Sequence, residues 1–231
     1  MKKLSKKNIE FKIAADGSSA SGKTTGGKIL ASKFKMKFLS SGTLYRFCAL
    51  KILNNKKKYD LRFINKVAKS ISLKKLQNNK KLYSPEVARL SSIIAKKPYV
   101  RKALKSFQKN FIKKYKLVVV EGRDIGSKIM PNADLKLFFT CSTKEKAKRR
   151  LKEFKQLEKK ITLKQVEKAL ILRDKEDTKR KISPLIMTKN AVLVDTTNLS
   201  LKQMEDKLVR LVKKSIKNKY GSLQKFRHST K

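Results

Sequence analysis

Eight residues, Gly17 to Thr24, could bind the phosphates of a nucleotide. They read GSSASGKT and fill every fixed position of the pattern G-x-x-x-x-G-K-[ST], directly after the extended apolar segment 9–15. In this pattern small residues let backbone N–H groups turn toward the phosphates, the lysine reaches the terminal phosphates, and the last hydroxyl holds Mg2+. The sequence therefore predicts a nucleotide site that includes Lys23 and Thr24. A Gly/Ser-rich turn with an incidental lysine is the alternative, and it leaves the other fixed positions unexplained.

Arginine is rare in this chain and therefore informative. Lys and Arg total 62, but only eleven of these residues are arginine. A guanidinium offers a planar fork of donors that matches phosphate and carboxylate edges, whereas lysine offers a mobile point charge. Ligands of an open parallel sheet bind beyond the carboxyl ends of its strands. Gly17, Ser41, Arg123 and Asp124 should all emerge there, so we expect them to share one ligand site.

The coarse pattern alternates short apolar strands with longer helical segments, which is typical of a parallel sheet with crossover helices. The expected strands are Ile9–Ala15, Lys37–Leu39, Leu117–Glu121, Leu135–Cys141 and Ala191–Asp195. The expected helices are Lys23–Phe34, Thr43–Leu53, Pro85–Ile94, Pro98–Lys114, Lys144–Phe154, Leu163–Lys175 and Leu201–Lys217.

Length and composition indicate one α/β domain. With 231 residues and 39% hydrophobic content the chain can build a single good core. No apolar run approaches the ~20 residues of a membrane helix, and no apolar region follows the basic N-terminus as in a secretory signal. We therefore expect a cytoplasmic protein with no membrane partner, and we expect a monomer. Cys48 and Cys141 lie in apolar stretches without metal-site spacing, which predicts buried thiols.

The formal net charge of +45 raises the question of a nucleic-acid partner. The lysines are spread in pairs and triplets along the whole chain, and no RNA- or DNA-reading motif accompanies them. We interpret most of them as solvated surface and expect no specific nucleic-acid partner. The single histidine, His228, lies in a polar tail and has no Ser or Cys arrangement around it, so we expect it to have no catalytic part.

Taken together, the motifs resemble one family, the bacterial cytidylate kinases, P-loop nucleoside monophosphate kinases that phosphorylate CMP and dCMP with ATP. The resemblance covers about residues 9–212 in family order. Its pieces are DGSSASGKT (16–24), SGTLYR (41–46), PEVARLSS (85–92), PYVR (98–101), GRDIG (122–126), PNADLKLF (131–138), RDKED (173–177) with Arg180, SPL (183–185) and VDTT (194–197). The phosphate loop alone would indicate only a superfamily, whereas GRDIG with the later pieces is much more selective.

The resemblance implies a three-layer P-loop kinase fold, with a five-stranded parallel sheet flanked by helices, a short insert that binds the monophosphate, and a mobile lid. On this basis residues 1–217 form the kinase domain, 72–97 the reduced insert and 154–181 the lid, while 218–231 form a basic disordered tail. No general base is needed, because the attacking oxygen already belongs to a phosphate anion. Alignment and charge neutralisation then supply the catalysis.

The family pattern also assigns roles to individual residues. ATP and Mg2+ are the implied cofactors, and ATP with CMP or dCMP the small-molecule partners. The residues implied to hold ATP are Gly17, Ser18, Ser19, Ala20, Ser21, Gly22, Lys23, Thr24 and Thr25, with Thr24 on Mg2+. The residues implied to bind the acceptor nucleotide are Ser41, Tyr45, Arg46, Ser92, Arg101, Arg123, Asp124, Arg173, Asp177 and Arg180. Within this set Ser41, Ser92, Arg101 and Asp124 would surround the cytosine. Lys23, Arg123 and Arg180 would be catalytic.

Three departures from the family pattern bear on function. Ser40 stands where members carry an Asp, Glu121 stands where a shorter Asp is usual, and the segment Ser72–Tyr83 is shorter than the usual insert. Closure over the acceptor should therefore be weaker or differently built. The alternatives are a kinase of another small acceptor, such as another monophosphate or shikimate, a basic nucleic-acid-binding ATPase, and a family copy with poor activity.

Overall fold

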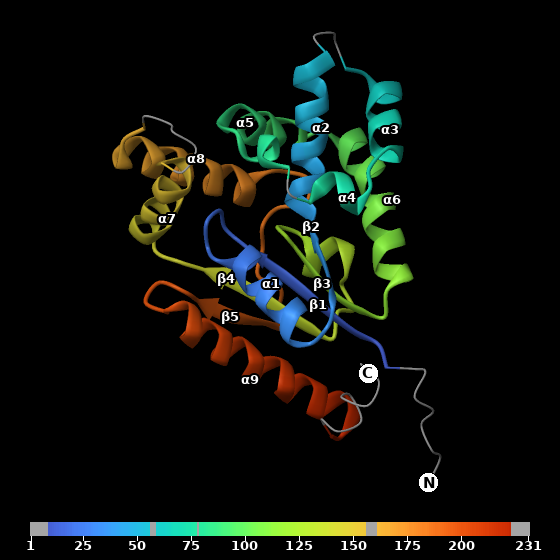
Figure 1. The fold of residues 1–231 in the computed structure, drawn as a ribbon, viewed down its shortest axis with the longest axis vertical. Coiled ribbons are helices and arrows are strands. Elements are labelled where there is room, and N and C mark those ends of the chain that lie inside the picture. Colours follow the sequence, from blue (N-terminus) through green and yellow to red (C-terminus); the bar gives the residue numbers. More distant parts are fainter. Residues whose placement is uncertain (1–8, 56–58, 78, 156–160, 223–231) are drawn as a thin grey trace. The chain divides into compact units, whose positions relative to one another are not determined.

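The computed structural model describes residues 9–55, 59–77, 79–155 and 161–222. The chain divides into two compact units. The sheet unit contains the residues up to Leu39 and those from Tyr115 onward, and the helical unit contains Ser40–Lys114. Figure 1 shows the elements of both.

A five-stranded sheet forms the centre of the sheet unit, in the order β2-β3-β1-β4-β5. Its strands are β1 (Phe11–Gly17), β2 (Lys37–Ser40), β3 (Leu117–Gly122), β4 (Leu135–Thr140) and β5 (Ala191–Asp195). The central strand β1 pairs parallel with both β3 and β4, and β4 pairs parallel with β5. All five predicted strands are confirmed, with ends within two residues of prediction. The run of valines at 118–120 is fully buried, as expected for a strand covered on both faces.

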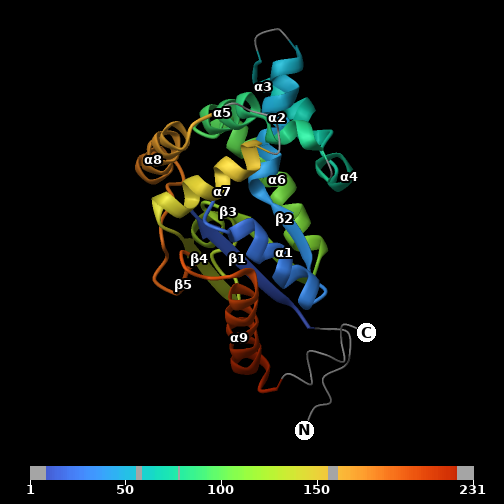
Figure 2. The same cartoon turned by 60° about the vertical axis from the view of Figure 1, so that its left-hand side comes forward.

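Two helices pack against this sheet and form its main core. They are α1 (Lys23–Lys33) and α9 (Leu201–Tyr220), and α9 lies along one face of the sheet in Figures 1 and 2. Met204, Leu208, Val212 and Ile216 recur at helical spacing along α9 and are buried in one cluster with Phe139 of β4. This core packing fixes the position of α1, and the phosphate-binding pattern leads into the start of that helix.

A helical hairpin follows β4 and is formed by α7 (Thr143–Lys155) and α8 (Leu163–Lys179). It has a small apolar cluster of its own, in which Ala147, Val166 and Leu170 are buried. Thr162 begins α8 with a reciprocal cap to Gln165. Helix α8 extends four residues beyond its predicted end at Lys175. Residues 156–160 of the predicted lid lie outside the described residues.

The helical unit contains α2 (Ser41–Asn55), α3 (Leu61–Lys69), α4 (Leu73–Leu76), the short 3-10 helix η1 (Lys80–Tyr83), α5 (Pro85–Ile94) and α6 (Pro98–Lys114). The predicted ends of α5 and α6 are confirmed, and α2 begins two residues before the predicted Thr43. The sequence did not predict α3, α4 or η1. Asp60 and Ser72 cap the first two of these with side-chain oxygens that accept backbone N–H groups.

Three further predictions concern the termini and the cysteines. The tail was predicted from residue 218, which is wrong for residues 218–220, because α9 continues to Tyr220 and ends at Gly221 with a left-handed φ of 75°. Residues 223–231, and with them His228, lie outside the described residues, as do residues 1–8. Cys48 and Cys141 are free and buried, as predicted. Within the described ranges, no helix combines the length and apolar character needed to cross a membrane.

Candidate active site

The predicted phosphate loop has a backbone that suits an anion. It follows β1 and leads into α1 at Lys23. Gly17 and Gly22 have φ values of 155° and 82°, and Ala20 has a φ of 57°. Positive φ at these positions turns neighbouring N–H groups toward one concave side, which forms an anion-binding nest. Gly17 is required for a second reason, since a Cβ there would lie 2.3 Å from the Phe139 carbonyl oxygen.

Lys23 is buried at the start of α1, with only 7% of its surface exposed. Its Nζ donates to the Ser18 carbonyl oxygen at 3.0 Å and lies 3.9 Å from Glu121 Oε2. Burial lowers the pKa of Lys23 to about 7, and the positive charge of Arg123 acts in the same direction, while Glu121 opposes both. The ammonium is therefore held in an environment that an additional negative charge would strongly favour.

Thr24 and Glu121 form a set of oxygens next to this lysine. Thr24 Oγ1 donates to Glu121 Oε1 at 3.2 Å, and Glu121 is 3% exposed at the end of β3. The longer carboxylate thus reaches the hydroxyl that the pattern assigns to Mg2+. Hydroxyl and carboxylate oxygens suit this hard cation. Ser18 Oγ is buried and, within the described residues, makes no hydrogen bond. These residues fit a Mg2+–nucleotide complex.

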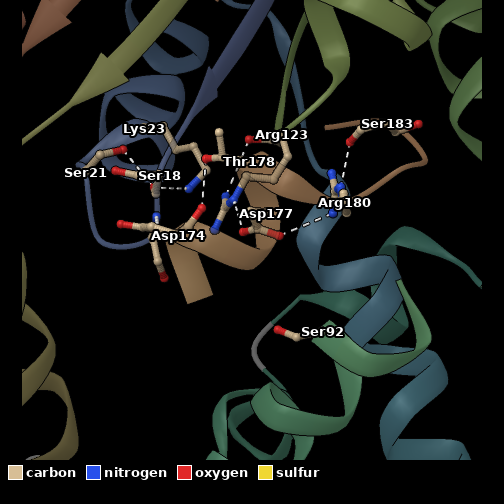
Figure 3. Close-up of polar contacts among 12 residues, drawn as sticks. Ser18, Ser21, Lys23, Ser92, Arg123, Asp174, Asp177, Thr178, Arg180 and Ser183 are labelled. Atoms are coloured by element: carbon tan, nitrogen blue, oxygen red, sulfur yellow. Dashed lines mark hydrogen bonds and ion pairs between the residues drawn. The ribbon is translucent and has the colours of Figure 1, made fainter. Parts of the chain in front are cut away.

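Arg123, Asp177 and Arg180 come together at one side of Lys23 in the sheet unit. Arg123 Nε donates to Asp177 Oδ2 at 2.8 Å, and Arg180 Nη1 donates to Asp177 Oδ1 at 3.2 Å (Figure 3). Burial alone would raise the pKa of the Asp177 carboxyl, but Arg123, Arg173 and Arg180 hold it below its usual value. Burial also opposes ionisation of Arg123, and Asp177 nevertheless raises the pKa of that guanidinium. Both arginines therefore stay charged, and the carboxylate fixes their orientation.

The loop that carries Arg123 and Asp124 is held by a buried acid of β1. Asp16 accepts hydrogen bonds from the N–H groups of Ile125 at 2.8 Å and Gly126 at 2.7 Å. Those residues begin the π-helical turn η2 (Ile125–Ile129). Burial raises the pKa of Asp16 to about 6, although the two hydrogen bonds act in the opposite direction. Asp124 is 5% exposed on this loop, and Asp16 thus positions it together with Arg123.

The remaining predicted acceptor residues lie in the helical unit. Arg101 donates to the Ala95 carbonyl oxygen at 3.1 Å and lies over the Tyr45 ring at 5.6 Å from its centroid. Arg46 is 9% exposed; it donates to the Leu82 carbonyl oxygen at 2.9 Å and lies over the Tyr83 ring. Ser41 accepts from Gln108 Nε2 at 2.5 Å.

Ser92 and Thr25 make fewer polar contacts. Ser92 Oγ donates to the Ala88 carbonyl oxygen at 3.4 Å within α5. Thr25 lies exposed in the first turn of α1. Within the helical unit, therefore, the structure brings Arg101 next to Tyr45 and Arg46 next to Tyr83.

Sequence reasoning missed several residues around the phosphate loop. Asp174 of α8 accepts from the Ser19 N–H at 3.1 Å and from Lys146 Nζ at 2.6 Å. Arg149 of α7 donates to the Thr196 side chain at 2.9 Å and to its carbonyl oxygen at 2.7 Å, and Thr196 Oγ1 in turn donates to the Ser21 carbonyl oxygen at 3.1 Å. The sequence analysis gave Arg149 no role in the site. Lys146 could not be distinguished among so many lysines.

A phosphate loop at the carboxyl end of a central parallel strand, with a buried lysine and fixed guanidinium groups beside it, defines a P-loop kinase. A model of the family described as cytidylate kinase matches residues 13–214. The chain belongs to the cytidylate kinase family.

The curated relatives have similar lengths. This chain is 37% identical over 216 residues to the cytidylate kinase of Thermotoga petrophila, a match that covers 88% of this chain and 97% of that protein. It is 35% identical to the cytidylate kinase of Rickettsia rickettsii over 206 residues, with coverage of 89% and 93%. Among solved structures, an uncharacterized protein from Eubacterium ventriosum shares the fold, with a TM-score of 0.50 at 13% identity and coverage of 87% and 97%.

Proposed function

We propose that this protein transfers the γ-phosphoryl group of ATP to CMP or dCMP, giving ADP and CDP or dCDP. One observation carries the proposal: the ammonium of Lys23 is buried at the phosphate loop, and Asp177 fixes the guanidinium groups of Arg123 and Arg180 beside it (Figure 3). Positive groups from the phosphate loop, the loop after β3 and helix α8 are thus concentrated where a migrating phosphoryl group would need them.

The sheet unit supports the donor half of the reaction. The loop 17–25 has glycines with positive φ that shape an anion-binding nest, and the ammonium of Lys23 lies at this loop, where it donates to the Ser18 carbonyl oxygen. A triphosphate requires both features. Thr24 with Glu121 would hold Mg2+, which, when bound, neutralises charge on the phosphates. Arg123 and Arg180, oriented by Asp177, would stabilise negative charge on the oxygens that surround the transferred phosphorus. No residue needs to remove a proton from the acceptor phosphate, because its oxygen is already anionic.

The family resemblance supports the acceptor half. Cytosine presents an amino donor at C4 and acceptors at N3 and O2, so it needs a carboxylate or hydroxyl at one end and a guanidinium at the other. Asp124, Ser41, Ser92 and Arg101 would supply these groups. Arg46 would bind the acceptor phosphate, and Arg173 and Asp177 would lie on the ribose side. Uracil would leave buried polar groups unpaired, and such a mismatch discriminates by orders of magnitude.

The decisive experiment is ADP release by purified protein with Mg-ATP and a panel of acceptors: CMP, dCMP, UMP, AMP, GMP and shikimate. Turnover confined to CMP and dCMP is the expected result. Equal turnover with AMP or shikimate would overturn the assignment of the base-reading residues. ATP consumption that needs no monophosphate and rises with added RNA would instead support a nucleic-acid-binding ATPase.

A further inference from the structure

Asp174 places a negative charge inside the site that should receive a phosphate. Its Oδ1 accepts the N–H of Ser19, the third residue of the phosphate loop, at 3.1 Å. Figure 3 shows Asp174 beside the loop that carries Ser18 and Ser21. A backbone N–H of this loop is a donor that a nucleotide phosphate would use. The carboxylate and an incoming phosphate therefore compete for one donor and repel each other.

The same carboxylate is held from its other side. Its Oδ2 accepts from Lys146 Nζ at 2.6 Å, and the two side chains are 19% and 9% exposed. Lys146 lies in the first turns of α7, and Asp174 lies near the end of α8. Arg150 of α7 also donates to Ser19 Oγ, at 3.3 Å. Residues from both helices of the hairpin thus meet at a single residue of the phosphate loop.

The helix that carries Asp174 also carries the charged groups of the transfer site. Arg173 and Asp177 are its neighbours on α8, and Arg180 is the residue at which α8 ends. Helices α7 and α8 share a buried apolar cluster, so the hairpin tends to move as one piece. Any displacement of Asp174 from Ser19 must then change where these groups lie.

We propose that Asp174 is a positioning residue that acts as an internal stand-in for phosphate. Without nucleotide it holds α8 on the Ser19 N–H. When ATP arrives, its phosphates take that donor, the carboxylate moves away, and the ammonium of Lys146 is left beside the triphosphate. Nucleotide entry is in this way coupled to a shift of α8 and of Arg173, Asp177 and Arg180. The inference rests on the proposed function for the nature of the ligand.

The test compares Asp174→Asn with Lys146→Met, using calorimetric binding of Mg-ATP in the absence of any acceptor. Asp174→Asn removes the competing charge and should tighten ATP binding about fivefold. Lys146→Met leaves the carboxylate unneutralised near the phosphates and should weaken binding by a similar factor. The two changes in ATP affinity must have opposite signs, because mere loosening of the hairpin would change the ATP affinity of both variants in the same direction. Asp206→Asn, the same chemical change at an exposed acid of α9, is the matched control and should leave ATP binding unchanged.

Steady-state kinetics give a second readout. Asp174→Asn should lower the KM for ATP and leave kcat within about threefold of the wild-type value, because the contact with Ser19 that it weakens is already broken once ATP is bound. Thermal unfolding identifies any variant that fails to fold. Unchanged or weaker ATP binding by folded Asp174→Asn would overturn the proposal. If wild-type protein binds ATP but does not phosphorylate CMP, the two variants should still change ATP affinity in opposite directions. Failure of the role proposed for Asp174 and failure of the proposed activity can therefore be told apart.

Discussion

Replacing Lys23 by Met should stabilise the nucleotide-free protein while abolishing most of its activity. Burial lowers the pKa of Lys23 from 10.5 to about 7, so an ammonium at this position opposes folding. Because the folded-state pKa is the lower one, this penalty is complete below about pH 7 and disappears as the pH rises toward 10.5. At pH 7 the shift corresponds to roughly 4 kcal/mol. The lost hydrogen bond to the Ser18 carbonyl oxygen offsets roughly 1 kcal/mol.

A net gain of roughly 3 kcal/mol should raise the Tm by roughly 6 to 12 °C. Urea unfolding at pH 6, 7.5 and 9 measures the free energy of unfolding, and the gain should shrink steadily across this series. Turnover should fall at least about a hundredfold. Lys28→Met, an exposed lysine of the same helix, is the matched control and should change stability by less than about 0.5 kcal/mol. A loss of stability in Lys23→Met, or a gain that does not depend on pH, would refute the electrostatic reasoning.

Three other changes test the acceptor site, the β3 loop and the core. Arg101→Lys loses a planar guanidinium stacked on Tyr45, and should raise the KM for CMP at least about tenfold while the KM for ATP changes little; equal effects on both substrates would contradict base reading. The pKa of Asp16 is about 6, so kcat/KM should fall as the pH drops through about 6, and Asp16→Asn should be poorly active and lack this pH dependence. Because the folded-state pKa is raised, the free energy of unfolding of the wild-type protein should instead increase as the pH drops through the same range. Gly26→Ala brings a Cβ to 2.9 Å from buried side chains of β4 and α9 and should cost about 1 to 3 kcal/mol in urea unfolding. Gly42→Ala, where the Cβ would make only an ordinary contact at 3.8 Å with Ser40 Oγ, should cost nothing.

The sequence was sufficient to predict the sheet and most helices, because their signals are local. Apolar runs bounded by turn residues indicated the strands, and Pro85 and Pro98 marked the first residues of two helices. The segments α3 and α4 are short and lysine-rich, and helices of this length owe their stability to packing rather than to propensity. Ile64 and Leu76 supply that packing. For α3 a local signal was available, because Ile64, Val67 and Ala68 recur at helical spacing after the cap Asp60, whereas the four residues of α4 are too few to show a period.

The candidate site divides in the same way. The phosphate-loop pattern identified Lys23 and Thr24 directly, since its spacing is fixed by the geometry of a single loop. The π-helical turn after β3 depends on Asp16, which is 109 residues away from Ile125 in the chain. The pairing of Asp174 with Lys146 depends on how two helices pack. One acid among many lysines cannot reveal its partner from the sequence.

The glycines of α1 show why a propensity argument can mislead. Gly26 and Gly27 weaken an isolated helix by about 1 kcal/mol each. In the folded protein a Cβ on Gly26 would meet Leu208 and Phe139 at 2.9 Å, and one on Gly27 would meet Phe38 at 2.7 Å. The missing side chains let α1 approach its neighbours closely, so the weak helix-formers are required by the packing.

The small apolar cluster inside the α7–α8 hairpin has a consequence for how the protein responds to its medium. Because Ala147, Val166 and Leu170 are buried within the hairpin itself, detaching the hairpin from the phosphate loop would expose little apolar surface to water. The contacts that would break there include Asp174 to Ser19, Arg150 to Ser19 and Asp177 to Arg123. Dissolved ions screen charged contacts of this kind, partly buried ones less than exposed ones, and leave apolar burial intact. The salt concentration of the medium thus influences how readily the hairpin detaches from the phosphate loop.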